Sequence, residues 1–349
     1  MALVTLSAPA QNSILNDANI TQLLFEDTAT DYLHYEARFY INNVEYDRVI
    51  LPRFTNSKMV LEFENLLLKY LEIPEPTGSY IQAFPMINNL KIDIWKAIDA
   101  GNLGLFYTLA NTFNYKTAFS YVSSNEMYFN NSLTFIAVDA NTLLIDANSM
   151  IQLPFHTTNT SNSFILRLIK EDGTNLSEVV VPNPNTSRTY LATMSVYAPP
   201  GIESLLFSIS VGTESISKRI RVFRNGLYQP KRIQFSNRYG MPMSVDLFGK
   251  MKKTKDIEAK TYTNSLSEYI TAEINQERLI TIDTGYLLES EKGIVDQIAT
   301  SLHVKIRENN VYHNCVVSHK SIPLSSDNEF NSNVQLQFRY NNSSKYKNV

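Results

Sequence analysis

The stretch Tyr35-Glu-Ala-Arg-Phe-Tyr-Ile-Asn-Asn-Val-Glu-Tyr-Asp-Arg-Val-Ile-Leu51 alternates apolar and polar side chains on both sides of a paired asparagine. The alternation places Phe39 and Ile41 on one face of a strand. Asn42 and Asn43 tolerate the positive φ angles that a two-residue hairpin turn requires. Residues 35–51 therefore predict an antiparallel β-hairpin.

Two further hairpins are predicted along the chain. Their strands and turns are residues 164–169, 171–174 and 177–181 in the first, and residues 220–223, 224–226, 227–229 and 233–235 in the second. The second turn contains Asn225-Gly226, the strongest short hairpin signal in the sequence. Strand signals of this kind dominate the chain.

Helical patterns are few and short. Residues 59–71 predict a strand that runs into about two turns of helix, and residues 92–100 predict a second helical segment. The clearest helix is predicted over residues 290–302, where Ser290 can act as N-cap and Glu291 lies in the positive first turn. Strand-like sequence precedes and follows this helix, which is the order of a small α+β unit.

The chain has 349 residues, 44% of them hydrophobic, which at about 150 residues per domain predicts two or three domains. Shifts in composition set the expected boundaries. We expect a mainly β protein with β-sandwich domains of the immunoglobulin or fibronectin kind, followed by a small α+β domain. The expected ranges are an N-terminal β domain with short helices at 1–122, a middle β-sandwich at 123–262 and the α+β domain at 263–349.

Motifs of common enzyme chemistries are missing from the sequence. Gly101-Asn-Leu-Gly104 lacks the third glycine and the lysine of a phosphate-binding loop, and neither Gly-x-Ser-x-Gly nor His-Glu-x-x-His occurs. Asp139-Ala-Asn and Asp146-Ala-Asn offer oxygen ligands but lack the glycine and distal glutamate of a calcium loop, so β-turns explain them better. We therefore expect no enzymatic activity and no cofactor.

One cluster has the residue types of a zinc site. His313, Cys315 and His319 would point to the same face of one strand, and His303 could approach from the helix. Residues four apart on an extended strand lie about 13 Å apart, which is too far to share one ion. We expect a buried thiol flanked by surface histidines, and a zinc-dependent enzyme is kept as a remote alternative.

Charge is unevenly distributed along the chain. Residues 218–260 contain twelve basic and three acidic residues, a net charge of about +9 in a protein of net charge −3. The segment is either a solvated basic face or an interface for an acidic surface of a neighbour. We choose Arg219, Arg221, Lys252 and Lys253 as candidate contact residues. Nucleic acid is a weaker interpretation, because the interleaved aromatic residues also suit a sandwich core.

The same region carries a resemblance to a known family. Val222-Phe-Arg-Asn-Gly226, Arg232-Ile-Gln-Phe-Ser-Asn-Arg-Tyr-Gly240 and Ser244-Val-Asp-Leu-Phe-Gly-Lys250 together resemble a β-rich module of tailed-bacteriophage structural proteins. Weaker echoes are Arg48-Val-Ile-Leu-Pro52, residues 61–71 and the C-terminal run from Leu279. Within the motif we expect a structural turn made by Phe235, Asn237, Tyr239 and Gly240, with the glycine allowing the reversal.

The resemblance implies a non-enzymatic component of a tailed-phage virion, in the tail, baseplate or neck. We expect a homo-oligomer that docks to other virion proteins, is assembled in the host cytoplasm and has no membrane partner, since no stretch of the sequence is long and apolar enough to span a bilayer. The alternative is a carbohydrate- or receptor-binding β-sandwich module, which the many tyrosine and asparagine residues keep open.

Overall fold

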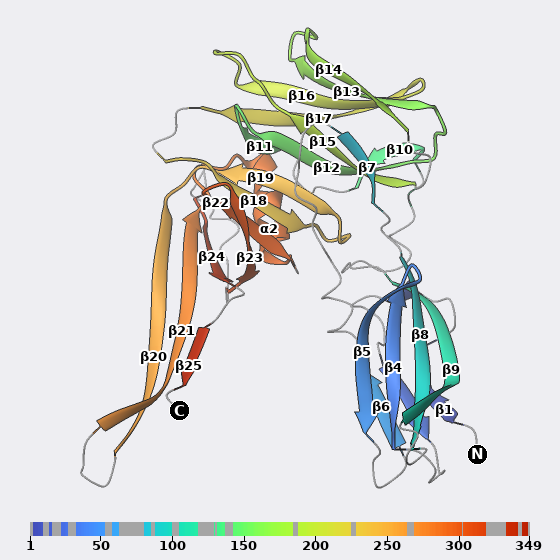
Figure 1. Ribbon diagram of the computed structural model, residues 1–349. Helices are drawn as coiled ribbons and strands as arrows, with labels where there is room; N and C mark the ends of the chain where they lie inside the picture. The colour runs from blue at the N-terminus through green and yellow to red at the C-terminus, as the bar shows by residue number, and fades with distance from the viewer. Residues whose placement is uncertain are drawn as a thin grey trace. The chain divides into compact units, whose positions relative to one another are not determined.

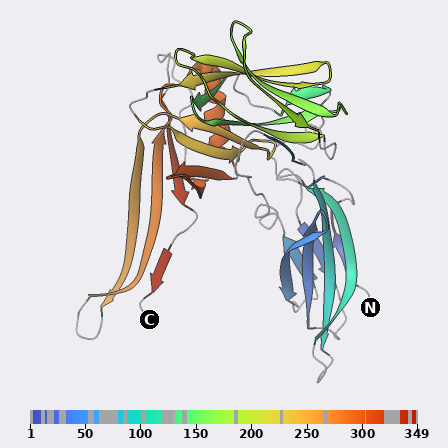
Figure 2. The ribbon, with the colours of Figure 1, turned by 45° about the horizontal axis from the view of Figure 1, so that its top comes forward.

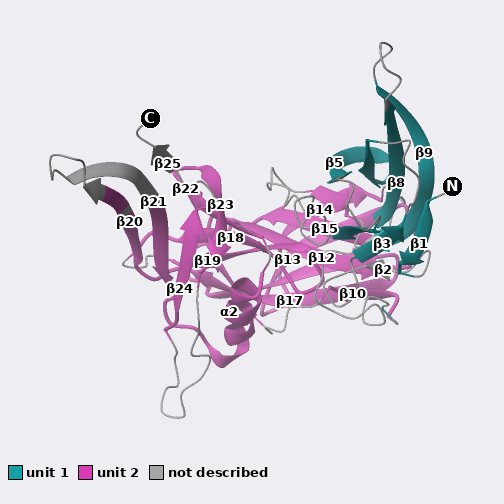
Figure 3. Cartoon of the chain, turned by 90° about the horizontal axis from the view of Figure 1, so that it is seen from below, with its two compact units in different colours: residues 1–72, 85–130 teal, residues 73–84, 131–349 magenta. Residues whose placement is uncertain are grey.

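The computed structural model describes residues 3–9, 14–15, 22–26, 33–52, 58–62, 80–84, 88–99, 105–117, 129, 131–136, 142–183, 188–224, 228–263, 269–301, 303–318, 333–340 and 344–347. The described chain is mainly β, with one short α-helix near its C-terminal end (Figure 1). Contacts divide the chain into two compact units, residues 1–72 with 85–130 and residues 73–84 with 131–349 (Figure 3).

Unit 1 consists of two sheets that share one hydrophobic core. The smaller, sheet A, has the order β1 (Val4–Ser7), β3 (Gln22–Glu26) and β6 (Lys58–Glu62). The larger, sheet B, has the order β2 (Ile14–Leu15), β9 (Leu105–Thr117), β8 (Asn88–Asp99), β4 (His34–Ile41) and β5 (Val44–Pro52).

The first predicted hairpin is confirmed as β4 and β5. Asn42 and Asn43 have φ angles of 50° and 68°, and Phe39 and Ile41 are both fully buried. The same device recurs at a position that the sequence interpretation missed. Asn309 and Asn310, with φ angles of 47° and 65°, form the turn between two strands of unit 2. Asparagine suits this turn because it adopts the left-handed conformation at a lower energetic cost than most residues.

Unit 2 contains a β-sandwich whose two sheets face each other (Figure 2). Sheet C has the order β10 (Leu133–Phe135), β12 (Met150–Thr157), β15 (Thr189–Ser195) and β7 (Tyr80–Ala83). Sheet D has the order β11 (Thr142–Asp146), β17 (Glu214–Phe223), β16 (Ser204–Val211), β13 (Ser163–Lys170) and β14 (Asn175–Pro182).

Aromatic rings hold the two sandwich sheets together. Phe155 and Tyr190 of sheet C lie 5.4 and 5.1 Å, between ring centroids, from Phe164 of sheet D. Such tilted ring pairs contribute beyond the area that they bury. The hairpin predicted over residues 164–181 is confirmed as β13 and β14, and Gly173 takes a φ of 85° in its turn.

The rest of unit 2 is a third, eight-stranded sheet, here called sheet E. Its order is β19 (Pro242–Leu247), β18 (Lys231–Ser236), β22 (Val304–Glu308), β23 (Val311–Val317), β24 (Gln335–Tyr340), β21 (Tyr269–Asp283) and β20 (Met251–Thr263), and β25 (Ser344–Lys347) also pairs with β21. Helix α2 (Lys292–Ala299) follows the 3-10 turn η3 (Glu289–Glu291) and adds Ile294, Val295 and Ile298 to the core of unit 2.

Three local predictions are wrong. Residues 92–99 belong to strand β8 rather than a helix, because Ile92 and Ile94 alternate into the core with period two. Strands β17 and β18 are not a hairpin, since β16 and β11 occupy both edges of β17 while β18 pairs in sheet E. Helix α2 has Glu291, not Ser290, at its N-cap. The turn residues 225–227 and the helix expected after Glu62 lie outside the described residues.

The expected mainly β fold with sandwich domains and a small α+β part is what the structure has. The grouping of strands differs from the expected domain ranges. The boundary expected at 122/123 lies near the transition between the units at 130/131, whereas the boundary at 262/263 falls inside sheet E, where β20 and β21 pair along their length.

Acidification should weaken the sandwich through His156. Burial, with a smaller contribution from Arg188, lowers the pKa of this β12 side chain below its usual 6.5. The unfolded chain therefore binds the proton more readily, so the free energy of unfolding falls as pH drops below about 6.5. Urea denaturation between about pH 7.5 and pH 5 should show a smaller decrease in H156Q than in the wild type. H313Q, at a partly exposed position, is the control, and an unchanged pH dependence in H156Q would contradict the prediction.

Candidate functional site

The hairpin of β18 and β19 buries both of its faces. Ile233, Phe235 and Val245 point into the hydrophobic core of unit 2. The opposite face is polar, with Arg232 paired across the strands to Asp246 and Gln234 paired to Ser244, and all four side chains are buried. Because side chains alternate along a strand, a one-residue slip would exchange these two faces.

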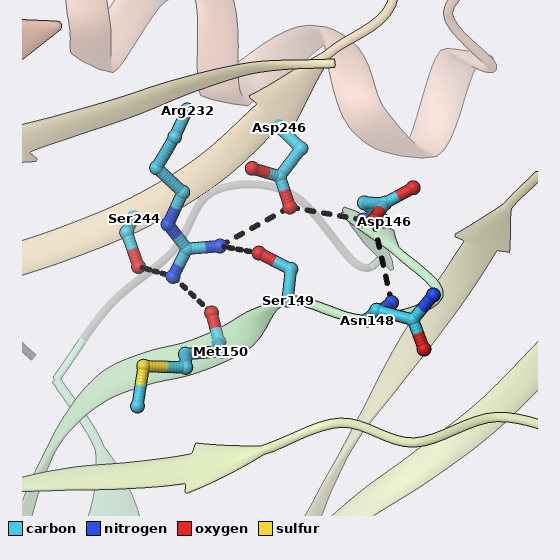
Figure 4. A network of polar contacts seen from close by, with 7 residues as sticks. All are labelled: Asp146, Asn148, Ser149, Met150, Arg232, Ser244 and Asp246. Atoms are coloured by element: carbon cyan, nitrogen blue, oxygen red, sulfur yellow. Dashed lines mark hydrogen bonds and ion pairs between the residues drawn. The ribbon is translucent and has the colours of Figure 1, made fainter. Parts of the chain in front are cut away.

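Arg232 and Asp246 form a buried ion pair at the open end of this hairpin. Arg232 Nη1 donates to Asp246 Oδ2 at 3.1 Å and to Ser149 Oγ at 2.6 Å. Its Nη2 donates to Ser244 Oγ at 2.6 Å and to the carbonyl of Met150. Figure 4 shows the guanidinium group directed toward these acceptors. The partners are necessary, because an uncompensated buried charge is strongly destabilising.

The polar face attaches sheet E to the sandwich. Asp246 Oδ2 also accepts a hydrogen bond from the backbone N–H of Asp146 at 2.9 Å, at the end of β11. Further along β18, Gln234 donates to Gln152 of β12 at 2.8 Å, and both side chains are fully buried. Polar contacts in a dry interface fix one relative position of the two layers, since any other position leaves them unpaired.

Asp146 belongs to a β-turn, as predicted. The N–H of Ser149 donates to the Asp146 carbonyl at 3.2 Å, and the N–H of Asn148 donates to the Asp146 carboxylate at 3.3 Å (Figure 4). The turn thereby presents Ser149 to Arg232. Asp139, the other half of the sequence echo, lies outside the described residues.

A polar cavity of about 320 Å³ opens above the ion pair. Lys253 and Glu308 pair with each other in its lining. Burial acts to raise the pKa of Glu308, but the hydrogen bonds from Lys253 and Tyr340 outweigh it, and the pKa lies below its usual value. The lining also contains the cation of Arg307, whose guanidinium carbon lies 5.9 Å from the ring centroid of Tyr312. The lining of this cavity thus contains both cations and carboxylates.

The predicted turn residues are brought together. Gly240 has a φ of 73°, and Phe235 is fully buried. Asn237 Oδ1 accepts hydrogen bonds from the N–H groups of Tyr239 and Met241 at 3.0 and 3.1 Å, and its Nδ2 donates to the carbonyl of Ile136 at 3.1 Å. The asparagine thus closes the turn and binds it to the residue that follows strand β10 of the sandwich.

Gly249, at the end of the motif, lies against Asp283, the last residue of β21. A Cβ atom at this position would lie 2.1 Å from the carbonyl oxygen of Asp283. Only glycine permits so close an approach between the end of β19 and the end of β21. The Asn-Arg-Tyr-Gly and Phe-Gly-Lys parts of the motif therefore both serve contacts between neighbouring segments of unit 2.

The four candidate interface residues do not form one patch. Arg219 and Arg221 lie on β17 in sheet D, and Lys252 and Lys253 lie on β20 in sheet E. Arg221 donates to both carboxylate oxygens of the fully buried Glu291, at 2.6 and 2.7 Å, and so attaches η3 to the sandwich.

The two other paired candidates also have intramolecular partners. Arg219 pairs with Glu171 at the surface, and Lys253 pairs with Glu308 in the cavity lining. Part of the basic segment thus neutralises carboxylates of the same chain. Lys252 is exposed on the edge strand β20.

Two of the candidate zinc residues, His313 and Cys315, lie on strand β23. Cys315 is buried, and burial raises the pKa of its thiol to about 12. The ring of His313 packs edge-on against Tyr340, 5.7 Å between centroids, while His319 lies outside the described residues. Among the residues that the structure describes, no group of three or more His, Cys, Asp and Glu side chains is arranged to hold a metal ion.

The sequence did not reveal that Asp246, Glu291 and Glu308 are partners of the basic segment. Glu291 was expected only to lie in the first turn of a helix, yet each of the three carboxylates neutralises a basic residue of residues 218–260. The alternation in β18 marks Arg232 and Gln234 as one polar face, but it does not say whether water or protein covers that face.

No protein-family model matches the chain, and no curated protein matches it. Similar solved structures include the polymeric Ig receptor ectodomain of a teleost fish, at 9% identity over 64% of this chain and 99% of that chain with a TM-score of 0.22. A chimeric titin Z1Z2 tandem shows 8% identity over 64% and 100% of the two chains, with a TM-score of 0.19. An ICAM-5 D1-D4 ectodomain fragment shows 10% identity over 89% and 75%, with a TM-score of 0.20. These likenesses concern β-sandwich folds and carry no functional argument.

Among the described residues, no helix has the length and apolar composition needed to cross a bilayer.

Removing one partner of the buried ion pair should destabilise unit 2. We expect D246A to lower the free energy of unfolding by about 3–5 kcal/mol, because Arg232 would remain buried without its countercharge. The double variant R232M/D246L should recover most of that loss, since it removes both charges. Urea denaturation is the measurement, and D256A at an exposed position of β20 is the control, expected within about 0.5 kcal/mol of the wild type. A loss below about 1 kcal/mol in D246A would refute the role of the pair.

The only cysteine should be unreactive in the folded protein. With burial raising the pKa of Cys315 to about 12, the thiolate that attacks thiol reagents is nearly absent at neutral pH. A colorimetric disulfide reagent should label about one thiol per chain in denaturant and close to none without it. Rapid labelling of the native protein would show that β23 is open to solvent.

Proposed function

We propose that this chain is a non-enzymatic structural component of a tailed-phage particle, in the tail, baseplate or neck. It acts by self-assembly and by docking to other virion proteins. The proposal rests on the resemblance of residues 221–250 to a module of such proteins and on what those residues do in the fold.

One observation carries the proposal. The residues of the motif are used to lock layers of unit 2 to one another, through the Arg232–Asp246 pair, the Asn237–Ile136 hydrogen bond and the close approach at Gly249. A part that transmits force between neighbours requires layers that do not slide, and directional buried contacts supply this rigidity. The buried polar groups of this region thus have structural partners.

Exposed strand edges support docking to neighbours. β20 is the last strand of sheet E, so one of its edges has no partner among the described strands. Figure 1 shows β20 and β21 extending as a long hairpin away from the rest of their sheet. Lys252 and Lys255 are exposed on β20 and give this edge a basic character. A basic edge resists pairing with a copy of itself and favours an acidic partner surface.

A carbohydrate- or receptor-binding module is the second candidate. The observation that favours it is the outer face of sheet B, where Trp95 and Tyr107 lie beside the carboxylates Glu36 and Asp93. Aromatic rings next to carboxylates are the groups that bind sugar rings. A glycan array on the full chain, with strong binding by a monomeric protein, would favour this candidate over assembly.

The proposed function predicts salt-dependent assembly. Sedimentation velocity should show larger species at about 0.1 M salt and smaller ones at about 1 M, because screening weakens contacts between the basic segment and acidic surfaces. K252E should reduce the mass at low salt, whereas K58E, at an exposed position of sheet A in unit 1, should not. A monomer at every concentration and salt would contradict self-assembly.

A further inference from the structure

We propose that the outer face of sheet B is a self-association surface, on which unit 1 of a second copy of this chain docks. The inference rests on the proposed function and names the surface that holds two copies together. The outer face consists of the side chains of β4, β5, β8 and β9 that point away from the core of unit 1.

Register defines this face. Cross-strand pairing aligns Ile50, Glu36, Trp95 and Leu109 in one row across β5, β4, β8 and β9. Residues of the opposite parity on β4, among them Tyr35, Ala37 and Phe39, are in the core. The row is therefore on the side of sheet B that faces away from sheet A.

Large apolar side chains are exposed on this face. Ile50 is 63% exposed, Leu109 48% and Tyr107 38%, and Trp95 between them is half-buried. The guanidinium carbon of Arg38 lies 4.7 Å from the ring centroid of Trp95 and 5.5 Å from that of Tyr107. Tryptophan, tyrosine and arginine are the residue types that dominate binding energy in protein interfaces.

The charges of the face are already paired. Arg38 binds Glu36 at 2.5 Å, Arg48 binds Glu45 at 2.8 Å and Lys91 binds Asp93 at 2.8 Å. Glu36 and Asp93 are themselves buried beneath the longer side chains. These three cations and three carboxylates balance one another around the row of Ile50, Trp95 and Leu109.

This balance of charges favours a second copy of the chain as the partner of the face. In a two-fold contact the same patch meets itself, so a patch of one sign would repel its copy. An apolar row flanked by internally neutralised charges can meet its own copy without that cost. A strongly acidic or basic partner would find no countercharge here, and the exposed isoleucine and leucine favour a protein over a sugar.

The area is sufficient for such a contact. Four strands about 4.8 Å apart, each with about eight residues at about 3.3 Å, cover about 500 Å² per copy. Two copies then bury about 1,000 Å², the lower limit of a specific interface.

Trp95 gives a direct test because it is the only tryptophan in the chain. At about 1 M salt, where charged contacts are screened, raising the concentration of the full chain should shift the tryptophan emission to the blue as the indole is covered. Sedimentation equilibrium of the same samples should show a dimer. I50E and L109E should each raise the dissociation constant at least tenfold, because each buries an unpaired carboxylate in the contact.

V180E is the matched control. Val180, on the edge strand β14 of unit 2, is an exposed apolar residue like Ile50 and Leu109. It should leave the high-salt dimer intact, and unchanged circular dichroism should show that all three variants fold. A high-salt dimer that survives I50E and L109E, or a monomer with concentration-independent emission, would overturn the inference. Assembly at low salt in either case would leave the proposed function standing.

Neutral oligosaccharides added to the monomer provide the other decisive outcome. A saturable emission change that V180E keeps and L109E loses, without dimer formation, would assign this face to a sugar and overturn the docking of a second copy.

Discussion

The architecture of unit 2 depends on a charged side chain that is buried between sheet E and the sandwich. Arg232 stands on a strand whose other face is in the hydrophobic core, and its own side chain is buried as well. It needs Asp246, Ser149, Ser244 and the Met150 carbonyl at the same time. These partners come from β19, from the connection between β11 and β12 and from the first residue of β12. The ion pair therefore ties the register of one hairpin to the position of the sandwich.

The same principle appears at two other junctions of unit 2. Arg221 reaches from β17 to the buried Glu291 and holds the turn before α2, and Asn237 fastens a turn of sheet E to Ile136. Each contact joins segments far apart in the sequence through a directional group. Hydrophobic burial alone is non-directional and would leave the layers free to shift.

Unit 1 uses its charges differently. Glu36 and Asp93 are covered by Arg38 and Lys91 on the outer side of one sheet, and Arg48 of β5 also lies within 3.9 Å of Glu36. The result is a surface on which paired charges surround exposed apolar side chains. In unit 2 the paired charges are used inside the fold, whereas in unit 1 they leave a face on which another protein can pack.

The sequence by itself determined the β character, the two hairpins at Asn42-Asn43 and at Gly173, and the turn of Asn237 and Gly240, because alternation and turn chemistry act over a few neighbouring residues. It misjudged residues 92–99, where a strand buried on one face resembled a short helix, and it joined β17 to β18 across a turn signal. Only the tertiary structure decided that the polar half of β18 faces protein and that Arg221 and Lys253 are bound to Glu291 and Glu308. The physical reason is that a local pattern fixes which side chains share a face, while the partner that covers the face comes from residues far away in the chain.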